Sequence, residues 1–103
     1  MRICFHLQVQ PEKLDEYKRH HRAVWPEVLA ELKAAGIRDY SLYLWENGHE
    51  FGVLECDDWD AVQRRLGGSE VMARWETFMA GYLATPVVPG KGPELLEEVF
   101  RLD

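Results

Sequence analysis

Long apolar runs are missing from this chain of 103 residues. No stretch approaches the roughly 20 consecutive apolar residues that a helix needs to cross a bilayer. The opening residues, Met1 to His6, are too few and too polar to form the apolar segment of a signal peptide. The sequence therefore predicts a cytoplasmic protein that has no membrane as a partner.

Basic residues and cysteines are also scarce. The chain has 12 lysines and arginines against 18 aspartates and glutamates, which gives a net charge of −6. A surplus of negative charge argues against nucleic acids and anionic membranes as partners, because both are negatively charged themselves. The two cysteines, Cys4 and Cys56, are too few for a disulfide framework, and we expect two free thiols in a reducing compartment.

Motifs for nucleotide, serine-hydrolase and metal chemistry are absent as well. There is no glycine-rich phosphate loop and no Gly-x-Ser-x-Gly elbow. His6, Glu16, His20 and His21 are potential metal ligands. However, adjacent histidines on a helix point about 100° apart and do not easily bind one ion. No cysteine pair or His-Glu-x-x-His motif accompanies them, so the sequence predicts neither a metal nor a cofactor.

Strand and helix patterns alternate along the chain. Strands are predicted for four segments in which apolar and polar side chains alternate or β-forming residues lie between turn signals: residues 2–10, 37–45, 51–56 and 94–102. Helices are predicted where apolar residues recur at a spacing of three and four: residues 12–35, 59–66 and 70–81. Asn47-Gly48 predicts a hairpin turn, and the prolines and glycines of residues 85–93 predict a loop.

Helix breakers and caps divide the helical segments. Pro26 interrupts the first one, which predicts two helical pieces with a kink near Val24–Trp25. Asp57 and Asp58 can cap the next helix, and Ser69 can cap the last. The resulting order is β-α-β-β-α-β, which is typical of the ferredoxin-like α+β fold. We expect one domain spanning residues 1–103, with a four-stranded antiparallel sheet and helices on one face.

Both faces of the second strand carry apolar or aromatic side chains. One face has Tyr40, Leu42 and Leu44, and the other has Ser41, Tyr43 and Trp45. We assign the face of Tyr40 to the side that the helices cover. The opposite face then also needs a cover, and the simplest one is a second copy packed sheet against sheet. The sequence therefore predicts a homodimer of the dimeric α/β-barrel type.

A row of aromatic side chains in the first helical segment is the strongest candidate for a site. Tyr17 and His21 are four residues apart and share one helix face, and Trp25 is expected to continue this row one turn later. His21 would be a general acid or base, because the unperturbed pKa of histidine is about 6.5. Tyr17 would hydrogen-bond a ligand hydroxyl. The alternative is that His21 is a satisfied histidine between helix and sheet, and that Tyr17 is a core tyrosine with its oxygen at the rim, which the pattern alone favours.

Trp75 and Glu76 form a second candidate in the last helix. An indole can stack on the apolar face of a sugar ring, and a neighbouring carboxylate can hydrogen-bond adjacent hydroxyls. Trp75 could equally be a large core residue, and Glu76 a solvated residue on the helix surface. With Tyr40 on the helix-covered side of the sheet, these residues predict a pocket for a small polyhydroxylated ligand.

Four stretches make the chain similar to the L-rhamnose mutarotase family, and together they span nearly its whole length. They are Glu16-Tyr17 with His20-His21 and Val24-Trp25-Pro26-Glu27; Tyr40-Ser41-Leu42-Tyr43-Leu44; Val71-Met72-Ala73-Arg74-Trp75; and Leu96-Glu97-Glu98-Val99-Phe100. The resemblance implies a dimeric α/β barrel that interconverts the α and β anomers of a deoxyhexose, L-rhamnose or a similar sugar such as L-fucose, without cofactor or metal.

The same resemblance implies roles for single residues. His21 matches the family's proton donor, and the residues that match its sugar-binding positions are Tyr17, Tyr40, Trp75 and Glu76. Family members carry a second tryptophan where this chain has Glu76, and an Asn-Pro-Asp-Asn-Ser-Pro-like loop where it has residues 85–93. Both differences border the expected pocket, so the resemblance points to the reaction more directly than to the sugar.

Mutarotation needs an acid for the ring oxygen and a base for the anomeric hydroxyl. His21 is the expected acid, whereas the base could be a tyrosine, Glu76 or a bound water. Two other functions remain open for this fold. One is a sugar-binding dimer without catalysis, and the other is a cofactor-independent monooxygenase, which would need a mostly apolar aromatic pocket.

Overall fold

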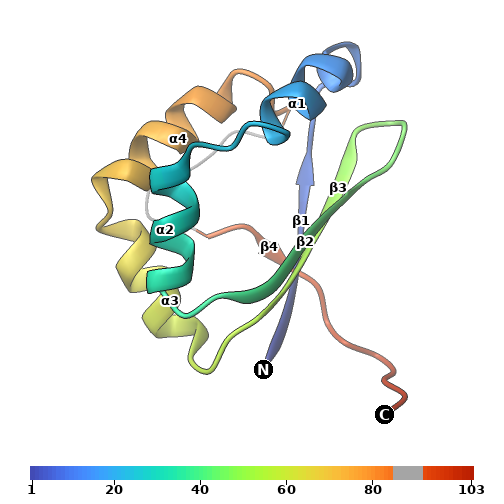
Figure 1. Ribbon diagram of the computed structural model, residues 1–103. Helices are drawn as coiled ribbons and strands as arrows, with labels where there is room; N and C mark the ends of the chain where they lie inside the picture. Colours follow the sequence, from blue (N-terminus) through green and yellow to red (C-terminus); the bar gives the residue numbers. More distant parts are fainter. Residues whose placement is uncertain (85–91) are drawn as a thin grey trace.

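The computed structural model describes residues 1–84 and 92–103, and Figure 1 shows their arrangement. The strands are β1 (Arg2–Gln8), β2 (Arg38–Leu44), β3 (His49–Glu55) and β4 (Glu94–Leu95). The helical elements are η1 (Pro11–Lys13), a 3-10 turn, and the α-helices α1 (Leu14–His21), α2 (Pro26–Ala34), α3 (Trp59–Gly67) and α4 (Glu70–Ala80). In the described residues the strands form an antiparallel sheet in the order β2-β3-β1-β4.

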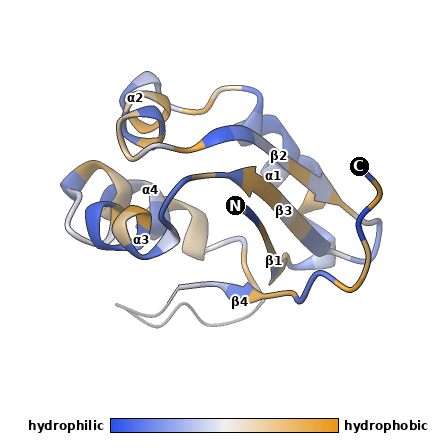
Figure 2. Ribbon diagram, turned by 90° about the horizontal axis from the view of Figure 1, so that it is seen from below, coloured by the Kyte–Doolittle hydropathy of each residue, from blue (hydrophilic) through white to orange (hydrophobic). Residues whose placement is uncertain are grey.

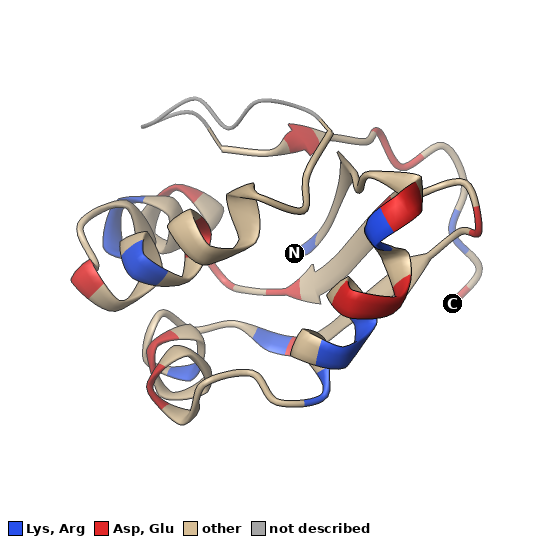
Figure 3. Cartoon of the chain, turned by 90° about the horizontal axis from the view of Figure 1, so that it is seen from above, with Lys and Arg blue, Asp and Glu red and all other residues tan. Residues whose placement is uncertain are grey.

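Helices α2, α3 and α4 cover one face of this sheet, and α1 lies at its end (Figure 1). The predicted ferredoxin-like α+β fold, with helices on one face of an antiparallel sheet, is therefore confirmed. Figure 2 shows that hydrophobic and hydrophilic residues are mixed along the strands, and Figure 3 shows that most charged residues lie on the helices and connecting segments. No helix among residues 1–84 and 92–103 is both long and apolar enough to cross a membrane.

The first helical segment is broken rather than kinked. Helix α1 ends at His21, and α2 begins at Pro26 after a short non-helical link. Trp25 has an extended backbone with ψ 132°, as expected for a residue before proline. The expectation that Trp25 continues the α1 row is therefore wrong. Its ring instead packs against helix α4, 5.0 Å from the ring centroid of Trp75 and 5.5 Å from that of Phe78.

Side-chain caps begin the last two helices as predicted. A carboxylate oxygen of Asp58 accepts a hydrogen bond from the Ala61 amide at 3.1 Å, and the Ser69 hydroxyl accepts one from the Met72 amide at 3.2 Å. Each cap satisfies a backbone donor that has no partner within its own helix. Asp57, the alternative cap for α3, instead forms an ion pair with Arg38.

A turn centred on Asn47-Gly48 joins β2 to β3, as predicted. Gly48 has a φ of +95°, and a Cβ at this position would lie 2.2 Å from the carbonyl oxygen of Val9. Only glycine meets both conditions without strain. The turn is short, so β3 begins at His49, two residues earlier than the predicted start at Phe51.

A bulge in β2 directs Tyr40 toward the helices. Arg38 pairs with Glu55 and Ser41 pairs with Val53, so the two residues between them face only one residue of β3. Asp39 adopts a φ of +48°, which L-residues rarely do. The side chains of Tyr40, Leu42 and Leu44 then face the helix-covered side. This confirms the predicted assignment of the faces of β2.

The last strand is much shorter than the predicted 94–102. Only Glu94–Leu95 pairs with β1, and one further hydrogen bond joins the Leu96 amide to the Cys4 carbonyl. The chain then leaves the sheet as an extended segment (Figure 1), in which Val99 is 88% and Phe100 79% exposed. An extended segment forms a strand only where another strand supplies hydrogen-bond partners. Of the predicted loop 85–93, residues 85–91 lie outside the described residues.

Two apolar clusters fill the space between sheet and helices. One, under α1, α2 and α4, contains the buried residues Val9, Tyr17, Val28, Met72, Trp75 and Met79. The other, under α3, contains Phe5, Ile37, Leu54, Cys56 and Val62. Both cysteines are free, with Cys56 buried and Cys4 half-buried. A cavity remains open beside the first cluster.

Candidate active site

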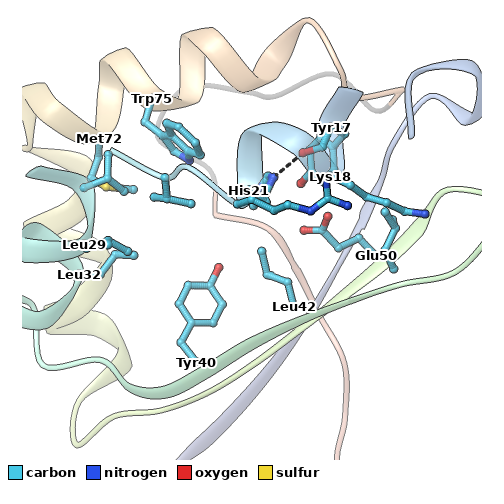
Figure 4. Close-up of a pocket in the computed structure, with 14 residues that line it drawn as sticks. Tyr17, Lys18, His21, Leu29, Leu32, Tyr40, Leu42, Glu50, Met72 and Trp75 are labelled. Atoms are coloured by element: carbon cyan, nitrogen blue, oxygen red, sulfur yellow. Dashed lines mark hydrogen bonds between the residues drawn. The ribbon is translucent and has the colours of Figure 1, made fainter. Parts of the chain in front are cut away.

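A cavity of about 550 Å³ lies between helices α1, α2 and α4 and the strands β2 and β3 (Figure 4). This volume is within the range of ordinary small-molecule sites. Its walls are mainly apolar and come from α2, from β2 and from Met72 of α4. A few polar side chains enter it from different elements: Tyr17, Lys18, His21, Arg22, Tyr40 and Glu50.

Helix α1 holds Tyr17 and His21 as a stacked pair. Their ring centroids are 4.3 Å apart, as expected for residues one turn apart on a helix. His21 Nδ1 lies 3.0 Å from the backbone carbonyl oxygen of Tyr17. A carbonyl oxygen can only accept a hydrogen bond, so Nδ1 carries a proton and donates it. The other ring nitrogen, Nε2, is therefore the atom that can exchange a proton with a ligand.

Tyr40 reaches the cavity from the opposite side. Its hydroxyl points across the cavity toward His21 in Figure 4. The Phe5 ring supports it edge-on, with 6.1 Å between ring centroids. Phe5 in turn lies flat against Gly52, where a Cβ would come within 2.2 Å of the phenyl ring. The absence of a side chain at Gly52 thus lets Phe5 support Tyr40.

Trp75 closes the cavity from helix α4. It is only 9% exposed, and its ring lies edge-on to His21 with 5.8 Å between centroids. Its other neighbours are Trp25 and Phe78, with centroids at 5.0 Å and 5.9 Å. The indole is therefore a rigid apolar wall beside the imidazole, fixed by aromatic packing.

Glu76, the residue after Trp75 on α4, does not line the cavity. It is exposed on α4, and the side chains that line the cavity do not include it. Partial desolvation still raises the pKa of its carboxyl. Four of the five predicted site residues, Tyr17, His21, Tyr40 and Trp75, thus line one cavity, and Glu76 lies outside it.

Glu50 is a cavity residue that the sequence interpretation missed. It is 2% exposed and lies on β3, the strand between β1 and β2. Its neighbours across the sheet are Leu7 and Leu44. Burial raises the pKa of the Glu50 carboxyl, although a hydrogen bond to the Tyr17 side chain and the charge of His21 act in the opposite direction. A carboxyl between two leucines on the core side of a sheet is unusual.

The Glu50 carboxyl also affects the pKa of the two tyrosines in the cavity. Burial raises the pKa of Tyr17, and the negative charge of Glu50 and a hydrogen bond to it raise it further. Burial and the Glu50 charge also raise the pKa of Tyr40. Both phenols therefore stay protonated at neutral pH and can donate hydrogen bonds.

The alternation of β3 is the signal that could have identified Glu50. Residues 50, 52, 54 and 56 share one face of the strand, and three of them are Gly52, Leu54 and Cys56, which suit a core. Glu50 is the one charged residue of that set. The predicted strand began at Phe51 and so excluded it.

His20 faces away from the cavity. Its Nε2 lies 2.9 Å from the Tyr82 hydroxyl, which donates a 3.0 Å hydrogen bond to a Glu16 carboxylate oxygen. These residues form a small polar network near the molecular surface. Within the described part of the chain, no three His, Cys, Asp or Glu side chains come close enough to hold a metal ion.

Comparisons of sequence identify similar proteins along nearly the whole chain. The family model for L-rhamnose mutarotase matches residues 2–102. An L-rhamnose mutarotase of Burkholderia ambifaria is 38% identical over 102 residues, which cover 98% of this chain and 97% of that protein. One of Oceanobacillus iheyensis is 32% identical over 100 residues, which cover 96% and 95%.

Comparisons of structure agree. The crystal structure of an L-rhamnose mutarotase from Formosa agariphila has a TM-score of 0.83 and 27% identity, and the match covers 100% of this chain and 99% of that one. Tetracenomycin F2 cyclase from Streptomyces glaucescens has a TM-score of 0.59 at 15% identity, over 100% of this chain and 97% of that one. The second likeness concerns the fold alone.

Proposed function

Because this chain belongs to the L-rhamnose mutarotase family, we propose that it is an isomerase that interconverts the α and β anomers of L-rhamnose or a similar deoxyhexose such as L-fucose. The observation that carries this proposal is the orientation of His21. Its Nδ1 is engaged by the Tyr17 carbonyl, which leaves Nε2 for a ligand in a cavity of about 550 Å³. That volume suits a monosaccharide.

The cavity supplies the other contacts that a sugar needs. Tyr17 and Tyr40 hydrogen-bond hydroxyl groups of the substrate from two sides. Trp75 forms an apolar wall against the C–H face of the ring. The family resemblance also assigns sugar binding to Glu76, which is exposed on α4 and is not among the residues that line the cavity.

His21 acts as the acid of a ring-opening reaction. The imidazolium gives the proton on Nε2 to the ring oxygen while a base removes the proton of the anomeric hydroxyl. The C1–O5 bond breaks, an open-chain aldehyde forms, and C1 rotates about the C1–C2 bond. Ring closure reverses both proton transfers and yields either anomer. The sequence of steps is redox-neutral and uses only proton transfer.

Anomer exchange measured by saturation-transfer NMR tests this function. A solution of L-rhamnose at equilibrium gives separate anomeric signals, and we expect wild-type protein to increase their exchange well above the spontaneous rate. His21→Ala should lose about 10²- to 10⁴-fold, the usual contribution of a general acid. Ligand binding by wild type without faster exchange would instead indicate a sugar-binding protein, and exchange equal to that of His21→Ala would refute the assignment of His21.

The polar groups of the cavity favour this function over oxygenase chemistry. A buried carboxyl, an imidazole and two phenols face the same space. An apolar polycyclic substrate would leave these groups desolvated and unpaired, at a cost of about 1–3 kcal/mol for each. A sugar hydroxyl can pair with each of them.

We also propose that the protein is a cytoplasmic homodimer. The sheet face opposite the helices exposes Tyr43, Trp45 and Phe51, and the segment after β4 exposes Val99 and Phe100. Exposed aromatic and apolar side chains of this kind are typical of a protein interface. A second copy covers it by packing sheet against sheet and by accepting the C-terminal segment. Two free cysteines suit a reducing compartment.

A further inference from the structure

Ring opening of a sugar needs a base as well as an acid, and the cavity contains a group suited to that role. The following inference deepens the proposed mutarotase function and rests on it. Among the side chains that line the cavity, Glu50 is the carboxyl. In Figure 4 its oxygens point toward the cavity, on the same side as Tyr17 and His21.

Glu50 has no ion-pair partner within the described residues, although its carboxylate is buried. It is 2% exposed, and buried carboxylates are ordinarily paired with a cation. In the part of the chain that the structure describes, the salt bridges do not involve Glu50. Its strand neighbours, Leu7 and Leu44, offer no polar side-chain atom. A buried carboxyl without a paired cation departs from ordinary core packing, and such departures are expected at functional sites.

We propose that Glu50 is the general base that removes the proton of the anomeric hydroxyl. The Glu50 carboxylate takes the proton of O1–H, and the O1–H bonding electrons form the C1=O1 double bond. The C1–O5 bond breaks, and its electrons take the proton from His21 Nε2. The open chain then lies between a neutral imidazole and a carboxylic acid, and closure on the other face of C1 returns both protons.

The surroundings of Glu50 support proton exchange by this carboxyl. Helix α1 contributes Tyr17, His21, Lys18 and Arg22, and β2 contributes Tyr40. The cavity walls from α2 and α4 are apolar or aromatic, so they contribute no charge. Burial raises the pKa of the Glu50 carboxyl above its ordinary value, and a higher pKa makes a carboxylate a stronger base.

Glu50→Gln tests this role, because glutamine keeps the size of the side chain and cannot accept the proton. We expect kcat for anomer exchange to fall about 10²- to 10⁴-fold while KM changes little. Glu46→Gln is the matched control, since Glu46 is an exposed residue of the neighbouring turn and the same atom is replaced. It should keep the wild-type kcat.

Chemical rescue separates a base from a structural residue. Glu50→Ala leaves room for a small carboxylate, and we expect formate to restore part of its rate, whereas formate should not restore His21→Ala. A folded Glu50→Gln protein with wild-type kcat would overturn the role of Glu50 while the mutarotase function stands. Wild-type protein without anomer exchange would overturn both.

The pH profile of wild type provides a test that needs no variant. We expect kcat/KM to fall at acidic pH as Glu50 becomes protonated. Because burial raises the pKa of Glu50, this fall should begin above pH 4.5, the ordinary pKa of a glutamate carboxyl. This acidic limb should be absent from the residual activity of Glu50→Gln. A wild-type rate that stays constant down to pH 4.5 would contradict the proposal even if the Glu50 variants do not fold.

Discussion

Glu50 shows that a residue suited to the chemistry of the cavity can lower the stability of the fold. Glu50 occupies a core position between Leu7 and Leu44, where an apolar side chain would pack without desolvating a charge. A hydrogen bond to the Tyr17 side chain and the charge of His21 offset part of this cost, because both act to lower the pKa of the carboxyl. The protein therefore carries a destabilising group at the position where we propose a proton acceptor.

Glu50→Gln should make the fold more stable at neutral pH, because it removes a carboxylate whose burial costs free energy. The folded-state pKa of Glu50 is raised, so the folded chain binds this proton more tightly than the unfolded chain does. The contribution of the group is fully present below the unfolded pKa and is lost as pH rises through the folded pKa. Urea denaturation of both proteins at pH 4.5 and 7.5 measures the difference, and a difference that is independent of pH would contradict this explanation.

Periodicity predicted the residues of the site that come from helices. Tyr17 and His21 are one turn apart in the sequence, and the helix keeps them so. Glu50 was missed because the predicted strand started at Phe51, two positions after the actual start of β3, which left Glu50 in the turn. The position of Trp25 was also missed. A proline fixes where a helix can restart, but tertiary packing decides where the residue before it points.

Among the secondary-structure elements, β2 and β3 determine where Tyr40 stands. The bulge at Asp39 turns β2 so that Tyr40 faces the cavity, and Gly52 on β3 lets the Phe5 ring lie beneath it. The three residues Phe5, Tyr40 and Gly52 therefore act as one packing unit on the helix side of the sheet.

Gly52→Ala should disturb this unit. The added Cβ would lie 2.2 Å from the Phe5 ring, so the ring must move and Tyr40 loses its support. We expect a loss of roughly 1–3 kcal/mol in the free energy of unfolding, as for other overpacked sites, together with weaker sugar binding. Gly67→Ala is the control, because a Cβ there meets nothing within 4 Å. Thermal unfolding of both variants tests this expectation. Equal melting temperatures for Gly52→Ala and Gly67→Ala would refute the packing argument.

The element order was predictable from the sequence, whereas the extent of the last strand was not. Residues 94–102 alternate as a strand does, but within one chain the pairing with β1 covers Glu94–Leu95 and ends with one hydrogen bond from Leu96. The alternation of apolar and polar residues indicates which side chains are suited to burial. A strand forms only where another strand supplies backbone hydrogen-bond partners. The unmet alternation after Leu95 points to a neighbour outside this chain.

For the molecule as a whole, the uncovered sheet face leads to a prediction about mass. Tyr43 is 63% and Trp45 62% exposed, which is unusual for aromatic side chains on a sheet. We expect sedimentation at micromolar concentration to give twice the chain mass of 12.0 kDa. Tyr43→Asp should shift the equilibrium toward single chains because it places a charge in the interface. Arg64→Asp, on the exposed side of α3, should leave this equilibrium unchanged. A wild-type protein that sediments with the mass of one chain would contradict the predicted dimer.

The hydrogen bond from His21 Nδ1 to the Tyr17 carbonyl has a consequence for engineering. Because a main-chain atom aims the imidazole, no substitution of a neighbouring side chain can delete the group that steers it. The walls opposite, on α2, β2 and α4, can accordingly be redesigned for other monosaccharides while the His21 ring, the proposed proton donor, keeps its direction. Helix α1 is thus the fixed half of the enzyme, and the rest of the cavity is the adjustable half.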